Sequence, residues 1–143
     1  MAVLGGALWH TVRNTDLTWR AFTKIKTPAA AGPFTSVACA AVSGDLQVVG
    51  LGAHAAGSNL WHTIRKAGGE WQAKASNVSD PGAARDFDAV SCTAIGGDLQ
   101  VIALLDGVLW HTARAAPGKW QATFGAVPAI DGGPLTLIGC AAV

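Results

Sequence analysis

Hydrophobic residues along the chain alternate with polar or small residues in short runs separated by turn residues. In the middle of the chain these runs cover residues 37–42, 46–51, 60–65 and 71–77. A period of two over such short runs is typical of half-buried β-strands, and the Ser-Gly-Asp at 43–45 is typical of a hairpin turn. The pattern predicts four antiparallel strands in this part of the chain and an all-β fold.

One motif, Leu-Trp-His-Thr-x-Arg, occurs three times, at residues 8–13, 60–65 and 109–114. Gly-Asp-Leu-Gln-Val also recurs, at residues 44–48 and 97–101. Each motif Trp is followed by a second Trp, in the pairs Trp9 and Trp19, Trp61 and Trp71, and Trp110 and Trp120. Repetition at a period near 50 residues, with four strands per unit, is typical of the blades of a β-propeller. We therefore predict a β-propeller with about three four-stranded antiparallel blades per chain.

The repeat is divided between the two ends of the sequence. Residues 134–143 match the first strand of a repeat, and the opening residues align with a second strand. A single domain, 1–143, is therefore expected to hold one split blade (1–32 with 134–143) and two continuous blades (33–85 and 86–133). Because propellers typically contain 4 to 8 blades, we expect strand sharing between two chains to close a six-bladed homodimer. A ring of three chains, an excerpt of a longer propeller and a β-trefoil are the alternatives.

Three cysteines, Cys39, Cys92 and Cys140, fall at one position of the repeat. Their spacing does not suggest a disulfide framework, so each is predicted to be a small buried residue.

Composition and charge exclude several classes of function. The 143 residues are 50% hydrophobic, which is enough for a packed core, and the net charge of +1 offers no basic surface for nucleic acid. No apolar run approaches the roughly 18 residues that cross a bilayer, and residues 1–6 lack the features of a classical signal peptide. We expect a soluble protein without membrane insertion, either cytoplasmic or released by a non-classical route.

Common enzyme motifs are missing from the sequence. It contains no Gly-x-Ser-x-Gly, no phosphate-binding loop and no His-Glu-x-x-His. The motif His recurs once per repeat, whereas an active site needs one His with differently placed partners. No second ligand lies at metal-binding spacing from it. We predict a protein that is not an enzyme and that has neither a metal nor a cofactor.

The repeated Leu-Trp-His-Thr-x-Arg, with the later Trp and the preceding Gly-Asp-Leu-Gln-Val, resembles the blades of bacterial propeller lectins of the Photorhabdus lectin type. The resemblance extends over essentially the whole chain. It implies multivalent binding of L-fucose or related O-methylated sugars in repeated pockets between adjacent blades. Those relatives look like seven-bladed single chains, so this chain departs from them in blade number.

The motif residues themselves suit a neutral sugar. Along a strand, the motif Trp and Arg share one face and the motif His lies on the other. An indole stacks on the C–H face of a pyranose, and Arg donates hydrogen bonds to its hydroxyls. The candidate sugar-binding residues are Trp9, His10, Arg13, Trp19, Trp61, His62, Arg65, Trp71, Trp110, His111, Arg114 and Trp120.

Structural roles are the alternative for these residues. The first Trp of each repeat then packs between blades, the Arg binds loop carbonyls, and the His joins neighbouring strands by a hydrogen bond. The matching alternative function is a non-catalytic structural or protein-interaction propeller, including an engineered or evolutionary propeller fragment.

Overall fold

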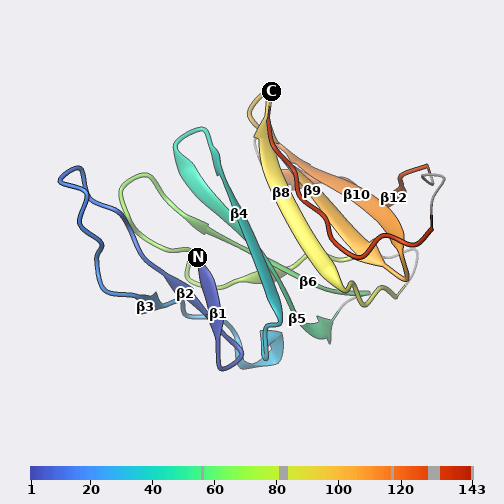
Figure 1. Cartoon of the computed structure of the whole chain (residues 1–143), viewed down its shortest axis with the longest axis horizontal. Helices are drawn as coiled ribbons and strands as arrows, with labels where there is room; N and C mark the ends of the chain where they lie inside the picture. Colours follow the sequence, from blue (N-terminus) through green and yellow to red (C-terminus); the bar gives the residue numbers. More distant parts are fainter. Residues whose placement is uncertain (56, 81–83, 117, 129–132, 143) are drawn as a thin grey trace.

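The computed structural model describes residues 1–55, 57–80, 84–116, 118–128 and 133–142. Within these residues the chain forms three antiparallel β-sheets and one short 3-10 helix, η1 (Ala29–Ala31). The sheets follow one another in sequence order from left to right in Figure 1. No helix in the described part of the chain is long and apolar enough to cross a membrane. The all-β prediction is confirmed.

Each sheet is formed by one repeat. Sheet 1 contains β1 (Ala2–Leu4), β2 (Ala7–His10) and β3 (Thr23–Lys24). Sheet 2 contains β4 (Ser36–Val42), β5 (Asp45–Ala55), β6 (Ser58–Arg65) and β7 (Ser76–Asn77). Sheet 3 contains β8 (Ala89–Ile95), β9 (Asp98–Leu105) and β10 (Val108–Ala115), and β10 also pairs with β11 (Lys119–Trp120) and β12 (Gly125–Ala126).

The outermost strand of each sheet differs from the continuous run that the sequence predicts. In sheet 2, Trp71 lies opposite Arg65 and Ser76 lies opposite His62. Five steps of the outer strand therefore span three steps of β6, so the residues between Trp71 and Ser76 bulge out of the ladder. Sheet 3 repeats this arrangement, because β11 and β12 are the two ends of one interrupted strand. In sheet 1 the bulge is smaller, since four steps from Trp19 to Thr23 lie opposite three steps from Arg13 to His10.

Apolar side chains pack the sheets against one another. The first junction, between sheets 1 and 2, is filled by Leu8, Ile25, Ala31, Phe34, Trp61 and Ala75. The second junction, between sheets 2 and 3, includes Leu51, Leu60, Val78, Phe87, Val90, Val101 and Phe124.

The motif Leu shows the direction of this packing. Leu8 is 2% exposed and Leu60 is 0% exposed, because the next sheet covers each of them. Leu109, at the same position in sheet 3, stays half-buried, since no sheet of the described chain lies beyond it. Sheet 3 therefore presents an uncovered face.

The C-terminal segment, residues 134–142, runs beside β8 rather than beside sheet 1 (Figure 1). Cys140 N–H donates to Ser91 Oγ at 3.1 Å, and Leu135 N–H donates to Gly107 O at 3.3 Å. The second bond corresponds to the bond from Phe34 N–H to Gly6 O, which joins the segment before β4 to sheet 1. The two parts of the predicted split unit thus lie at opposite ends of the row of sheets. Val143, which ends that unit, is outside the described residues.

The three cysteines lie on the first strands or on the C-terminal segment. Cys92 is buried, and burial together with the neighbouring Cys39 and Cys140 raises the pKa of its thiol to about 12. Cys39 is exposed and Cys140 is half-buried, so the prediction that every Cys is buried is correct only at Cys92. Cys92 lies on β8, which has β4 on one side and the C-terminal segment on the other. In the described chain, sheet 1 has no first strand that would cover β4 and its Cys39 in the same way.

Two glycines of β5 allow the segment around η1 to lie directly on sheet 2. The Phe34 ring covers Gly50, and a Cβ added at Gly52 would overlap the carbonyl oxygen of Ala31. Replacing Gly52 by Ala should therefore lower the free energy of unfolding by roughly 2–4 kcal/mol, because the backbone must move away. Urea denaturation measures the change.

Gly125→Ala is the matched control for this substitution. Gly125 is exposed, and the nearest atom to an added Cβ is 4.0 Å away, at His111 O. We expect a change within about 0.5 kcal/mol. Equal stabilities of the two variants would contradict the close approach at Gly52.

Candidate functional site

A His from one sheet meets a Trp from the next sheet at both junctions. At the first junction, the rings of His10 and Trp71 have centroids 5.4 Å apart and an interplanar angle of 83°. At the second junction, His62 and Trp120 repeat this geometry at 5.3 Å and 84°. Edge-to-face contact is a favourable arrangement for aromatic rings. One constellation is therefore built twice from equivalent residues.

Each of these Trp residues also lies beside the motif Arg of its own sheet. Arg65 pairs with Trp71 across the strands, and Arg114 pairs with Trp120. The Arg65 guanidinium packs over Gly69, where an added Cβ would lie 3.1 Å from Nη2. Gly69 has a φ of 102°, which suits glycine in this turn. The turn thus holds the guanidinium beside the indole.

A pocket of about 300 Å³ opens beside this constellation at the first junction. The bulged outer strand of sheet 1 forms one side, and Arg65, Gly69 and Trp71 of sheet 2 form the other. The lining residues are His10, Thr11, Val12, Arg20, Ala21, Thr23, Arg65, Gly69 and Trp71. Its volume is at the lower end of the range for small-molecule sites.

Sheet 3 carries one side of an equivalent pocket on its uncovered face. The space is about 360 Å³ and is lined by His111, Gln121, Ala122, Thr123 and Gly125. These residues correspond to the sheet 1 side of the first pocket. In the described chain, nothing supplies the opposite side with its Arg and Trp.

Sheet 1, at the other end of the row of sheets, carries an Arg and a Trp of this kind on an uncovered face. Arg13 pairs with Trp19, as in the other repeats, but Trp19 is 66% exposed. The two open ends therefore carry complementary parts of the same constellation.

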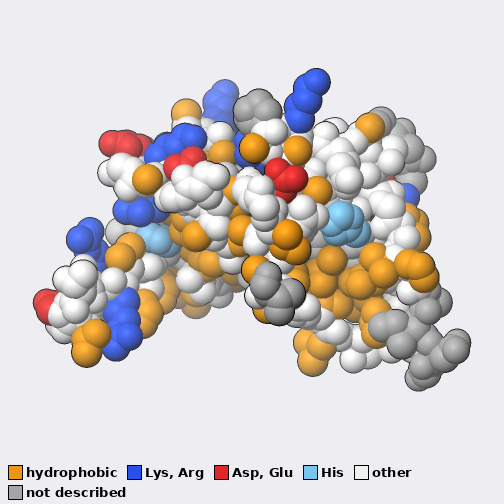
Figure 2. All heavy atoms as spheres, turned by 90° about the horizontal axis from the view of Figure 1, so that it is seen from above, with side chains coloured by type: hydrophobic (Ala, Val, Ile, Leu, Met, Phe, Trp, Pro, Cys, Tyr) orange, Lys and Arg blue, Asp and Glu red, His pale blue; other side chains and the backbone are white. Residues whose placement is uncertain are grey.

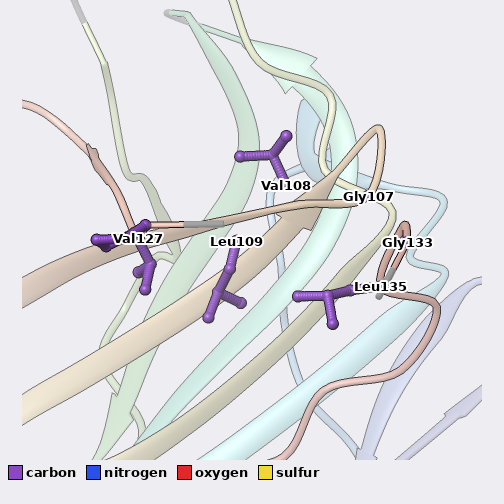
Figure 3. A pocket seen from close by; sticks show the side chains of 7 residues that line it. Gly107, Val108, Leu109, Val127, Gly133 and Leu135 are labelled. Carbon is purple, nitrogen blue, oxygen red and sulfur yellow. The ribbon is translucent and has the colours of Figure 1, made fainter. Parts of the chain in front are cut away.

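An apolar pocket of about 110 Å³ lies elsewhere on sheet 3. The side chains of Leu109, Val127 and Leu135 border it, whereas Val108 points away from them (Figure 3). It contains no charged lining residue in the described chain, so it suits packing rather than polar recognition.

The first Trp of each repeat lies outside the pocket lining that contains His10, Arg65 and Trp71. Trp61 is 7% exposed and donates from Nε1 to Ala53 O at 2.8 Å, and Trp9 donates to Leu4 O at 3.3 Å. Trp110 lies under Arg85, whose Cζ is 3.6 Å from the ring centroid. The motif Trp and the motif Arg are four positions apart on an extended strand, a separation of about 13 Å. Trp9, Trp61 and Trp110 thus belong to the packing of their sheets.

Two of the motif histidines are tied to a glutamine of the neighbouring strand. His62 Nε2 lies 2.6 Å from Gln47 Oε1, and His111 Nε2 lies 2.8 Å from Gln100 Oε1. We assign these as donations from the imidazole N–H to the amide oxygen. In the described residues, no three His, Cys, Asp or Glu side chains come close enough to share a metal ion.

Burial and a nearby Arg keep the junction histidines neutral. Burial, followed by the charge of Arg114, lowers the pKa of His62 to about 3. Burial and then Arg65 also lower the pKa of His10. At neutral pH the site therefore offers uncharged imidazoles beside a charged guanidinium.

Several residues of the site were missed by sequence reasoning. Gln47 and Gln100 stand in the repeated Gly-Asp-Leu-Gln-Val, so the repetition itself was a usable signal. Arg20 and Thr23 carry no such signal, because only the bulge of the outer strand turns them toward the pocket.

No family model, no curated protein and no solved structure gives a significant match to this chain. The resemblance to propeller lectins therefore stays an expectation that the sequence motifs carry.

Acidification should destabilise the protein through His62. Because its pKa is lowered to about 3 in the folded state, only the unfolded chain binds a proton between pH 6.5 and about 3, and stability falls as pH decreases through this window. His62→Gln keeps an amide partner for Gln47 and removes this titration. The stability lost between about pH 7 and pH 4 should be about 3 kcal/mol smaller in the variant. Urea denaturation at both pH values measures this difference, and parallel losses in the two proteins would contradict it.

Proposed function

We propose that this protein is a carbohydrate-binding lectin with repeated monosaccharide sites at its sheet junctions. The observation that carries the proposal is the pocket at the first junction, where Arg65, Trp71 and His10 converge. The recurrence of the same His–Trp contact at the second junction supports a repeated site.

The chemistry of the pocket favours L-fucose or a related neutral sugar as the ligand class. The Trp71 indole offers an apolar surface for pyranose C–H groups, and Arg65 offers a rigid set of donors for hydroxyl oxygens. Thr23 and the uncharged His10 add hydrogen-bonding groups without charge. The described lining contains no carboxylate, whereas most glycosidases use a pair of them. Binding without hydrolysis is the function that fits these residues.

The three sheets are proposed to be the blades of a propeller that closes when two chains meet. Sheet 3 exposes the Leu109 and His111 face of a junction, and sheet 1 exposes the Trp9 and Trp19 face. Within the chain, faces of these two kinds always pack on each other. A second copy therefore supplies the cover that each end lacks, and its C-terminal segment supplies the first strand of sheet 1.

Closure would also complete a third site. His111 and Gln121 of one chain would meet Arg13 and Trp19 of the partner chain, in the arrangement of the first pocket. Three sites per chain on one rigid ring raise the effective concentration of each further contact. Attachment to a glycan-coated surface would then be about 10²-fold to 10⁴-fold tighter than single-site binding.

Removing the guanidinium groups should weaken sugar binding. We expect Arg65→Gln together with Arg114→Gln to weaken L-fucose binding about tenfold at the two junctions, since each loses charge-assisted hydrogen bonds. Isothermal titration calorimetry with L-fucose measures this. Lys74→Gln, at an exposed position outside the pocket lining, is the control and should bind like the parent. Unchanged affinity in the double variant, or no binding of any monosaccharide by the parent at millimolar concentration, would overturn the lectin proposal.

Closure should protect the Cys39 thiol. This thiol is exposed in the single chain but would lie under the partner's C-terminal segment in the ring. We expect slow labelling by a thiol reagent in the parent and fast labelling in Trp19→Glu, which places a charge in the proposed interface. Trp19 is mostly exposed, so the variant should keep its circular dichroism spectrum. Equally fast labelling of Cys39 in both proteins would argue against a closed ring.

A further inference from the structure

The first and second junctions differ in the charged residues beside the motif Arg. At the second junction Asp45 and Lys66 line the space that contains Arg114, whereas the pocket at the first junction contains Arg20 and Arg65.

Arg20 follows the second Trp of its repeat, whereas the other two repeats have Gln72 and Gln121 at this position. The same place beside the bulge therefore carries a cation at the first junction and a neutral amide elsewhere.

Arg20 and Arg65 border the same pocket from opposite sides. Arg20 belongs to the outer strand of sheet 1, and its Nε donates to Asn14 Oδ1 at 2.9 Å. That bond is the only side-chain hydrogen bond of Arg20 within the described chain, so its two terminal amino groups stay available. Arg65 is fixed from the sheet 2 side by its packing over Gly69.

No carboxylate of the described chain lines this pocket. Asp16, in the same hairpin as Arg20, accepts hydrogen bonds from the Thr18 hydroxyl at 2.7 Å and the Thr18 amide at 3.0 Å. Glu70 lies over Gly68, where an added Cβ would be 2.9 Å from Oε2. The two guanidinium charges are therefore not neutralised within the pocket.

The surface around the first junction carries Lys and Arg side chains with some Asp and Glu side chains among them (Figure 2). Figure 2 shows most of the Lys and Arg side chains of that face toward the left and centre, on the side where Figure 1 places sheets 1 and 2. The right side of this face is mainly hydrophobic and uncharged. An anion would be attracted to the first junction more strongly than to sheet 3.

We infer that the pocket at the first junction binds sugars that carry a carboxylate or sulfate group, with the anion held between Arg20 and Arg65. This inference rests on the proposed lectin function and divides its sites into two kinds. Guanidinium groups bind such oxyanions by paired, charge-assisted hydrogen bonds, which a Gln at the same position does not provide. The sites with Gln72 and Gln121 accept neutral sugars.

The test compares D-galacturonic acid with D-galactose, which differ by a carboxylate in place of the C6 hydroxymethyl group. Binding is followed by NMR through the indole N–H signal of Trp71, assigned with a Trp71→Phe variant. We expect the parent to bind the acid about fivefold more tightly than the neutral sugar at low salt. The difference should decrease as NaCl is raised, because salt screens a partly exposed site.

Variants at the two equivalent positions separate charge from structure. Arg20→Gln should remove the acid preference read at Trp71, while Arg20→Lys should keep part of it. Gln72→Arg should create a weaker preference at the second junction, read from the Trp120 signal, because it adds the second cation there while the carboxylate of Asp45 stays beside Arg114.

Each outcome decides between the two proposals. Loss of the acid preference in Arg20→Gln and its gain in Gln72→Arg support the inference. A parent that binds L-fucose but shows no acid preference, or a preference that persists in Arg20→Gln, overturns the inference and leaves the lectin proposal standing. A Trp71 signal that responds to no sugar at millimolar concentration overturns both.

Discussion

The contact between unlike faces of successive sheets is the interaction on which the rest of this structure depends. The Leu and His face of one sheet packs on the Trp and Thr face of the next, which buries Leu60 and Thr112 almost completely at the second junction. Full burial of a Leu side chain contributes about 1.5–3 kcal/mol, so each uncovered face gives up a comparable amount. This direction of packing orders the sheets and leaves one face of each kind open at the ends.

The same contact also positions the candidate site. It brings His10 of one sheet against Trp71 of the next, while the bulge in the outer strand keeps that strand from filling the space beside them. A regular outer strand would continue the ladder and close the pocket. The packing of the sheets therefore repeats the His, Trp and Arg constellation, and the bulge of the outer strand leaves it accessible to a ligand.

The repeated motifs predicted the all-β sheets and three of the four strands of sheet 2 within a few residues. They did not predict that the Arg and Trp of one sheet lie beside the His of the preceding sheet, since alternation along a strand does not place residues of different sheets relative to one another. The pocket pairs His10 with an Arg and a Trp that lie far along the chain. The bulge that admits Arg20 depends on a mismatch in strand length, which no local pattern records.

Native mass spectrometry of the unmodified chain tests directly whether junction packing sets the assembly. Because each end exposes the partner of the other, the account predicts a dimer at twice the chain mass of 14.5 kDa across dilute concentrations. A stable monomer of 14.5 kDa with both end faces in water would contradict it.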